Sequence, residues 1–204
     1  MMQAELNFPG RGGLRAGAGR KKSKASGMPH LRREEFAERH PVHVTLRLAK
    51  GCWNLRSRRA LRALEAAFHA GRERFGFRLV HYSVQGNHRH LVTEAAGKES
   101  LTRGVKGLEV RLARALNNLM RRKGRVFGDR YHAHILKTPR EAARALRYVL
   151  MNFAHHARGW GERIAATFID PFSSVRYLAA SPGPAAPVAE PRAWLLRVGW
   201  LAAG

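Results

Sequence analysis

Short stretches in which apolar and polar side chains alternate predict four β-strands. Residues i and i+2 of a strand point to the same face of a sheet, so alternation indicates a strand with one buried face. In the first stretch, Val42, Val44 and Leu46 share one face and His43 falls on the other. The four predicted strands cover residues 41–48, 77–84, 88–93 and 130–136.

Three other stretches place apolar side chains at the spacing of a helix, over residues 58–75, 100–123 and 138–157. Glycines at positions 76, 124 and 159 are expected to end them. The third helix has a clear start, with Thr138 as N-cap, Pro139 at the first helical position and Glu141 two residues later. The middle helix has the longest apolar stripe, made of Leu101, Val105, Leu108, Leu112, Leu116 and Leu119.

The elements follow one another in the order β-α-β-β-α-β-α. The first six match the ferredoxin-like, split β-α-β order. The predicted class is therefore α+β, with an antiparallel sheet that carries two helices on one face, and with a further C-terminal helix. The other face is left available for a site or for that third helix. Gly86 and Asn87 tolerate positive φ, so they are expected to form a two-residue turn between the second and third strands.

Composition divides the chain into three parts. Residues 1–40 form a basic, flexible arm rich in Gly, Arg and Lys, which cannot bury enough apolar surface to fold. Residues 41–178 form the globular domain. Residues 179–204 form a flexible Pro-rich linker and a short tail. Residues 1–30 lack the apolar core of a secretory signal, and no run of about 18 apolar residues exists, so no membrane span is expected.

The charge points to a polyanionic partner. Lys and Arg number 38 against 14 Asp and Glu, which gives a formal net charge of +24. Nucleic acid is the first interpretation, with a membrane surface and a generally basic protein as alternatives. The single cysteine, Cys52, excludes an internal disulfide and a cysteine-based zinc cluster, and it is compatible with a reducing cytoplasm.

Two pairs of residues carry candidate chemistry. His88 and His90 lie two apart on a predicted strand, so both imidazoles project from one face. Tyr148 and Asn152 lie one turn apart on the last predicted helix. Two nitrogens and an amide oxygen suit Mg²⁺ or Mn²⁺. A tyrosine hydroxyl is a weak nucleophile until a nearby positive charge stabilises its phenolate.

These residues stand in patterns that resemble the HUH single-strand nucleases and, more closely, the REP-associated tyrosine transposases. The stretch 87–92 matches their pattern N-H-x-H-L-hydrophobic. The stretch 147–152 matches their R-Y-hydrophobic-x-x-N helix, although Phe153 stands where proline is usual. Two weaker similarities to the family are the aromatic-rich stretch that leads into the last strand, at 126–131, and the pair Ser173-Ser174. The resemblance covers about residues 40–178.

The resemblance implies an enzyme in which Tyr148 attacks single-stranded or hairpin DNA and forms a 5′-phosphotyrosine. His88, His90 and Asn152 would hold the divalent metal. It also implies a bacterial cytoplasmic protein that joins the nucleoid when bound to DNA, as a monomer or a homodimer. The basic residues expected to hold DNA are Arg20, Lys21, Lys22 and Lys24 in the arm and Arg111, Arg121 and Arg122 on the middle helix.

Other residues leave alternatives open. His132 and His134 form a second pair on a strand and are candidates for DNA contact or for supporting the metal ligands. Arg130, Arg147 and His155 are candidates for the same roles, whereas His43 and His81 are interpreted as ordinary strand histidines.

Arg89 departs from the family pattern, which has a bulky apolar residue between the histidines. A buried Arg needs a partner, so it is expected either to reach solvent past the helices or to pair with an acid such as Glu65 or Glu109. A catalytically decayed or non-catalytic module that binds DNA or RNA hairpins is the alternative function.

Overall fold

A computed structural model of the chain describes residues 33–159, 163, 165, 168–178 and 182–203, with the backbone alone for 154–159. Five strands form one antiparallel sheet in the order β2-β3-β4-β1-β5. They are β1 (Val42–Arg47), β2 (Glu73–Arg74), β3 (Phe77–Val84), β4 (His88–Ala95) and β5 (His132–Ile135). The helices are α1 (Arg58–Gly71), α2 (Lys98–Leu119), α3 (Pro139–Gly159), α4 (Trp194–Arg197) and the 3-10 turns η1 (Val175–Tyr177) and η2 (Gly199–Ala203).

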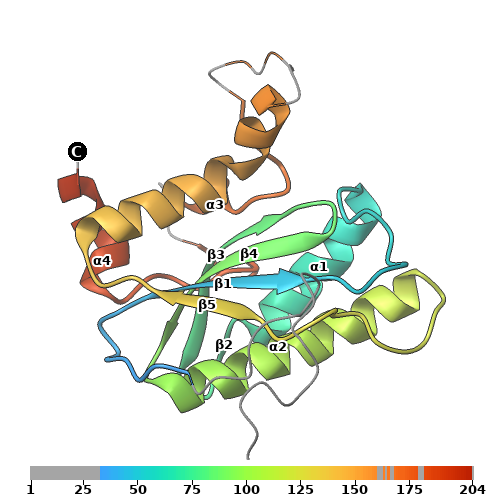
Figure 1. The fold of residues 1–204 in the computed structure, drawn as a ribbon, viewed down its shortest axis with the longest axis horizontal. Helices are drawn as coiled ribbons and strands as arrows, with labels where there is room; N and C mark the ends of the chain where they lie inside the picture. Colours follow the sequence, from blue (N-terminus) through green and yellow to red (C-terminus); the bar gives the residue numbers. More distant parts are fainter. Residues whose placement is uncertain (1–32, 160–162, 164, 166–167, 179–181, 204) are drawn as a thin grey trace, which may run out of the picture.

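The predicted ferredoxin-like arrangement is confirmed. Leaving aside β2, which is only two residues long, the order β3-β4-β1-β5 is that of a split β-α-β sheet. Helices α1 and α2 cover one face, and α3 crosses the other face over β3 and β4 (Figure 1). The capping box at the start of α3 is also present, because Glu141 N donates to Thr138 Oγ1 and the Glu141 carboxylate accepts from Thr138 N.

The main core lies between the sheet and the two helices on its covered face. The apolar stripe of α2 is buried there as its spacing predicts. Gly104 lets α2 approach the sheet, because a Cβ at this position would lie 2.1 Å from the Phe77 ring. A second, smaller core joins α3 to the other face, where Leu146 and Val149 meet Val80 and Val92.

Three local details differ from the sequence expectations. Helix α1 ends at Gly71 rather than near Gly76, because the chain then forms β2 and turns back through Phe75 and Gly76 into β3. The turn at 86–87 forms as expected, but neither residue has a positive φ. A bulge between Leu79 and His81 interrupts the alternation of β3.

The segment predicted as a flexible linker packs against the domain instead. Ala186 and Val188 are buried in the main core, and Ala189 N donates to Leu79 O. The small apolar residues of this segment thus add to the main core, although its high content of Pro and Ala predicts a flexible linker. None of the helices in the described part of the chain is long and apolar enough to cross a membrane.

The chain that follows α3 is fixed to β3 through a buried serine. Ser174 Oγ accepts from Tyr82 N at 2.9 Å and lies 3.2 Å from His81 Nδ1. Both Ser174 and His81 are buried. Burial lowers the pKa of His81 from 6.5 to about 4, since the charged imidazolium is poorly solvated there.

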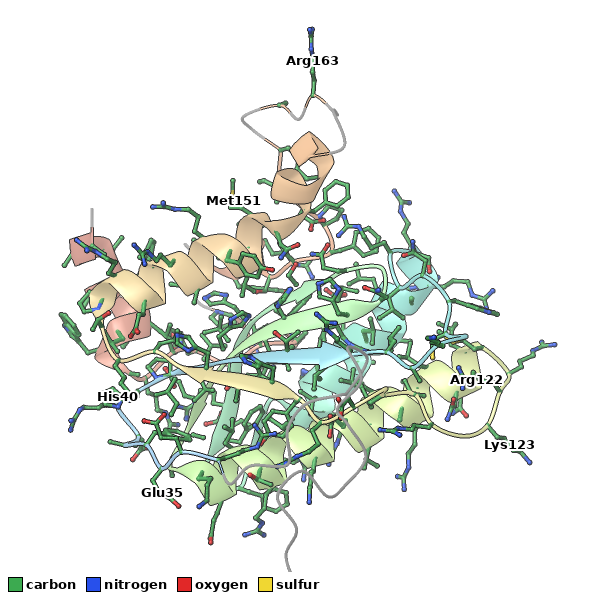
Figure 2. The ribbon with its side chains drawn as sticks, in the orientation of Figure 1. Glu35, His40, Arg122, Lys123, Met151 and Arg163 are labelled. Atoms are coloured by element: carbon green, nitrogen blue, oxygen red, sulfur yellow. The ribbon has the colours of Figure 1, made fainter. Side chains whose placement is uncertain are left out.

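His81 should therefore make stability depend on pH. Between pH 6.5 and about 4 the unfolded chain binds a proton that the folded chain excludes, so stability falls as pH drops through this window. The loss should be roughly 3 kcal/mol for this histidine. Urea unfolding of His81→Asn across this range should show a flatter pH dependence than the wild type. His40→Asn, on the surface before β1 (Figure 2), is the control and should leave the slope unchanged; equal slopes for all three proteins would contradict this assignment.

Candidate active site

His88 and His90 lie on the face of β4 that is turned toward α3, as their spacing predicts. Their ring centroids are 4.8 Å apart. Alternate residues of β4 point the other way, so Arg89 and Leu91 face the α1/α2 side. The histidine pair is thus on the sheet face that α3 only partly covers.

Helix α3 brings Tyr148 to this pair. The Tyr148 ring centroid lies 5.0 Å from that of His90, with the rings edge to face. Tyr148 is 43% exposed, so it is in contact with solvent as well as with His90. Asn152, one turn further along, is fully buried, and neither its amide oxygen nor its amide nitrogen has a hydrogen-bond partner among the described residues.

Hydrogen bonds at the Nδ1 atoms orient both imidazoles. His88 Nδ1 lies 2.7 Å from Asn87 Oδ1. The amide oxygen can only accept, so the proton is on His88 Nδ1 and the lone pair is on Nε2. His90 Nδ1 lies 3.1 Å from His43 Nε2 and 3.2 Å from Thr45 Oγ1. Either group can accept a hydrogen bond from His90 Nδ1–H; in that tautomer the lone pair is on Nε2, the form in which imidazole binds a metal.

His43, which the sequence suggests is an ordinary strand histidine, lies against the candidate site. Besides its contact with His90, its ring centroid lies 5.9 Å from that of Tyr148. Burial, together with nearby His132 and His134, lowers the pKa of His43 from 6.5 to about 4, so its imidazole is neutral near pH 7. The alternation of β1 already placed His43 on the face away from α1 and α2, but only the pairing of β1 with β4 reveals which neighbours it has there.

The imidazole nitrogens of His88 and His90 and the amide oxygen of Asn152 are ligand types that suit a divalent metal ion with mixed nitrogen and oxygen coordination. A buried amide without a partner costs about 1–3 kcal/mol, and a cation at its oxygen would remove part of that cost. In the part of the chain that the structure describes, no group of three or more His, Cys, Asp or Glu side chains is arranged to hold a metal ion. The candidate set instead combines His88 and His90 with the amide oxygen of Asn152.

The second histidine pair lies beside the first on the same sheet face. Strand pairing sets His132 opposite Thr45 and His134 opposite His43, and both β5 histidines are exposed. Helix α3 packs mainly on β3 and β4, so Arg47 on β1 and both β5 histidines stay exposed, whereas His43 is half-buried beside Tyr148. We call this part of the sheet the β1/β5 shelf, made of His43, Thr45, Arg47, His132 and His134. It is continuous with the candidate site rather than a competing one.

The structure separates the other basic candidates. Arg147 is exposed on α3 next to Tyr148. Arg130 instead lines a cavity of about 800 Å³ beside α2, and Arg111 lies on α2, both on the opposite side of the sheet. Arg121 and Arg122 follow α2, and Figure 2 shows Arg122 and Lys123 projecting away from α3. The sequence could not separate them, because charge alone does not reveal which face a residue occupies.

Several candidates fall outside what the structure describes. Arg20, Lys21, Lys22 and Lys24 lie outside the described residues. His155 is within α3, but its side chain is not described. Their predicted contacts with DNA stay predictions.

Arg89 does not reach solvent. It is fully buried, and its three guanidinium nitrogens have no hydrogen-bond partner among the described residues. Its Cζ lies 5.0 Å from the Phe127 ring centroid, and burial lowers its pKa to about 10. Glu65 is not its partner, because it accepts from Tyr82 and Arg176. Glu109 is near enough to interact electrostatically but forms no hydrogen bond with it.

Arg89→Met should therefore stabilise the protein. The substitution keeps a long flexible side chain and removes a buried charge, which should raise the free energy of unfolding by about 1–4 kcal/mol. Guanidinium unfolding measures the change, with Arg114→Met on the exposed face of α2 as control. A clear loss of stability in Arg89→Met alone would show that the guanidinium has a stabilising partner.

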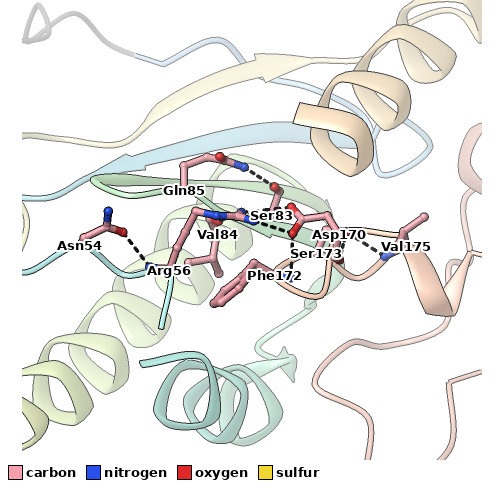
Figure 3. A network of polar contacts seen from close by, with 9 residues as sticks. All are labelled: Asn54, Arg56, Ser83, Val84, Gln85, Asp170, Phe172, Ser173 and Val175. Carbon is pink, nitrogen blue, oxygen red and sulfur yellow. Dashed lines mark hydrogen bonds and ion pairs between the residues drawn. The ribbon is translucent and has the colours of Figure 1, made fainter. Parts of the chain in front are cut away.

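The Arg56 side chain connects the chain after α3 to the end of β3 (Figure 3). Arg56 donates to both carboxylate oxygens of Asp170, at 2.8 and 3.1 Å, and to Val84 O at 3.0 Å. Its Cζ also lies 3.8 Å from the Phe153 ring centroid and 4.4 Å from that of Phe172. Phe153, which replaces the usual proline, thus anchors the helix directly beside Asn152.

Comparison with known proteins supports this architecture. No protein-family model and no curated protein matches the sequence. Among solved structures, one of a REP-associated tyrosine transposase bound to a REP hairpin aligns with a TM-score of 0.57. The alignment covers 73% of this chain and 84% of the other, at 16% identity. The chain therefore has the fold of a REP-associated tyrosine transposase, the family that its two sequence motifs resemble.

Proposed function

We propose that the protein is a metal-dependent nuclease and strand transferase that acts on hairpin-associated single-stranded DNA through Tyr148. One observation carries the proposal: the exposed Tyr148 ring lies against His90, one turn from the buried amide of Asn152, which no described residue satisfies. Packing among the described residues explains neither the exposed tyrosine nor this amide. A site that receives a cation and a phosphate explains both.

The chemistry follows from the tyrosine. Tyr148 Oη attacks the phosphorus of a phosphodiester, and the bond from phosphorus to the 3′ oxygen breaks. The products are a 5′-phosphotyrosine and a free 3′-hydroxyl, which gains the proton that the tyrosine gives up. A 3′-hydroxyl can reverse the step without ATP, because the phosphodiester energy is kept in the tyrosyl ester. Mg²⁺ or Mn²⁺ at His88, His90 and Asn152 would supply positive charge at the phosphate oxygens.

The β1/β5 shelf is the proposed path of the DNA strand toward Tyr148. Its residues Arg47, His132 and His134 are exposed, and so are Arg140, Arg144 and Arg147 on α3. Arginines near the path of the strand would hold its phosphates without reading bases. Hairpin DNA is proposed as the substrate because the solved transposase with this fold was bound to a REP hairpin.

The test is to map a covalent adduct. The protein is incubated with Mn²⁺ and a DNA hairpin flanked by single strands, then digested and analysed by mass spectrometry. Of the four tyrosines, Tyr82 and Tyr131 are buried, so a phosphodeoxynucleotide should be found on Tyr148. Tight hairpin binding without any adduct would favour the non-catalytic binding module instead. An adduct on another tyrosine would contradict the proposed nucleophile.

A further inference from the structure

A second cavity lies at the end of the sheet far from the histidine pair. It has a volume of about 620 Å³ and is lined by residues of β2, the start of β3, the end of β4 and the segment 192–194. His88 begins β4 and Ala95 ends it, so the cavity lies roughly 23 Å from the candidate active site along that strand. None of the chemistry proposed for Tyr148 uses it.

One wall carries an aromatic residue in an unfavourable backbone conformation. Phe75 has a φ of 57° and Gly76 a φ of 72°, so the pair forms a two-residue turn with positive φ at both positions. Asn-Gly is the preferred pair for such a turn, and a bulky residue at the first position costs about 1–3 kcal/mol. Burial offsets little of this cost, because Phe75 is 54% exposed. The Cζ of Arg103 lies over the Phe75 ring, 4.7 Å from its centroid, and the rest of the ring is exposed at the cavity.

The other wall carries a second exposed aromatic residue, Trp194, whose ring packs against the backbone of η2 at Gly199. Trp194 is 57% exposed and begins α4. A Cβ on Gly199 would lie 2.6 Å from the Trp194 ring, so the glycine allows that ring to pack closely. The preceding backbone is held as well, because the buried Glu94 carboxylate accepts from Arg192 N and Ala193 N at 2.9 Å.

Between the two rings the lining is polar and nearly balanced in charge. Arg78 pairs with Glu73 and Glu94, and Arg192 pairs with Glu73. These pairs offer hydrogen-bonding groups with little net charge, which suits the edge of a base better than a phosphate. Arg39 and Arg74 also line the cavity, and neither forms an ion pair with a described residue.

We propose that this cavity binds an unpaired base of single-stranded DNA, with Phe75 and Trp194 both contributing to its stacking and with its phosphates near Arg39 and Arg74. Exposed aromatics beside cations are the usual platform for single strands. A folded protein partner would be expected to meet a wider apolar surface than these two rings provide. The proposal takes DNA as ligand from the proposed function, but it does not depend on cleavage.

Phe75→Asn is the decisive variant, because it separates binding from folding. Asn-Gly suits the turn, so the melting temperature should stay level or rise. Binding of a fluorescein-labelled oligothymidylate, measured by anisotropy with EDTA present, should weaken about 5- to 100-fold, as expected for the loss of one base stack. Trp194→Ala should weaken binding by a similar factor. Trp53→Ala, which removes an equally exposed tryptophan outside the cavity, should leave the affinity unchanged.

A second measurement locates the base directly. An oligonucleotide with one 5-iodouracil should photocrosslink to the peptide containing Phe75 or Trp194. Wild-type affinity in both variants, or crosslinks only elsewhere, would overturn the proposal. The two proposals can be contradicted separately. If an adduct forms on Tyr148 but Phe75→Asn binds DNA as the wild type does, only the proposed base-binding cavity is contradicted. If Phe75→Asn binds more weakly but the wild type forms no adduct, only the proposed cleavage is contradicted.

Discussion

Tyr148→Phe should abolish formation of the covalent protein–DNA adduct and lower strand cleavage on the order of 10³-fold or more. Phenylalanine keeps the ring contacts with His90 and His43 and removes only the hydroxyl group that attacks phosphorus. The loss should therefore appear in the chemical step and not in DNA binding. Single-turnover cleavage of a labelled hairpin on a denaturing gel measures the rate, and anisotropy in EDTA measures the affinity.

Tyr177→Phe is the matched control for this substitution. Tyr177 lies in η1, after α3, and is half-buried, so it is the other tyrosine with access to solvent. Its removal should leave the cleavage rate within about twofold of the wild type. If the adduct persists in Tyr148→Phe, another group is the nucleophile, whatever the affinity for DNA.

Asn152→Leu should move activity and stability in opposite directions. Leucine has nearly the shape of asparagine but no polar atoms, so it removes a buried amide that no described residue satisfies. The free energy of unfolding should rise by about 1–3 kcal/mol. The same change removes the proposed oxygen ligand, so cleavage at limiting Mn²⁺ should fall at least about 100-fold. Urea unfolding and a Mn²⁺ titration of the cleavage rate measure the two effects.

A control is needed because leucine is also the better helix former. Asn118→Leu, on the exposed side of α2, gives the gain due to helix propensity alone. The excess stability of Asn152→Leu over this control is the cost of the unsatisfied amide. An Asn152→Leu protein that is both less stable and fully active would show that the amide serves packing.

Local patterns were sufficient to predict four of the strands, the three long helices and half of the candidate site, but not the short strand β2. Two-residue spacing paired His88 with His90, and four-residue spacing paired Tyr148 with Asn152, because both periods are properties of a single element. The strand order also followed, since the ferredoxin-like arrangement allows few alternatives once the element order is known.

Residues whose roles depend on contacts between elements were not predictable in this way. His43 reaches the site only through the pairing of β1 with β4, and Arg56 only through contact with a residue 114 positions away. The bulge in β3 shifts the alternation within a strand whose polar and apolar residues are all buried, so the polar–apolar pattern does not reveal it. Arg130 was assigned by charge, which carries no information about the face of the sheet.

The ion pair between Arg56 and Asp170 can form only late in the synthesis of the chain on the ribosome. Asp170 is synthesised 18 residues after Asn152, and Ser174, which fixes the same segment to β3, comes later still. At typical rates of synthesis these residues follow Asn152 by about one to four seconds. Until they emerge, Arg56, which lies over the Phe153 ring of α3, lacks its carboxylate partner Asp170. The nascent chain therefore carries Tyr148 before the contact between Arg56 and Asp170 can form.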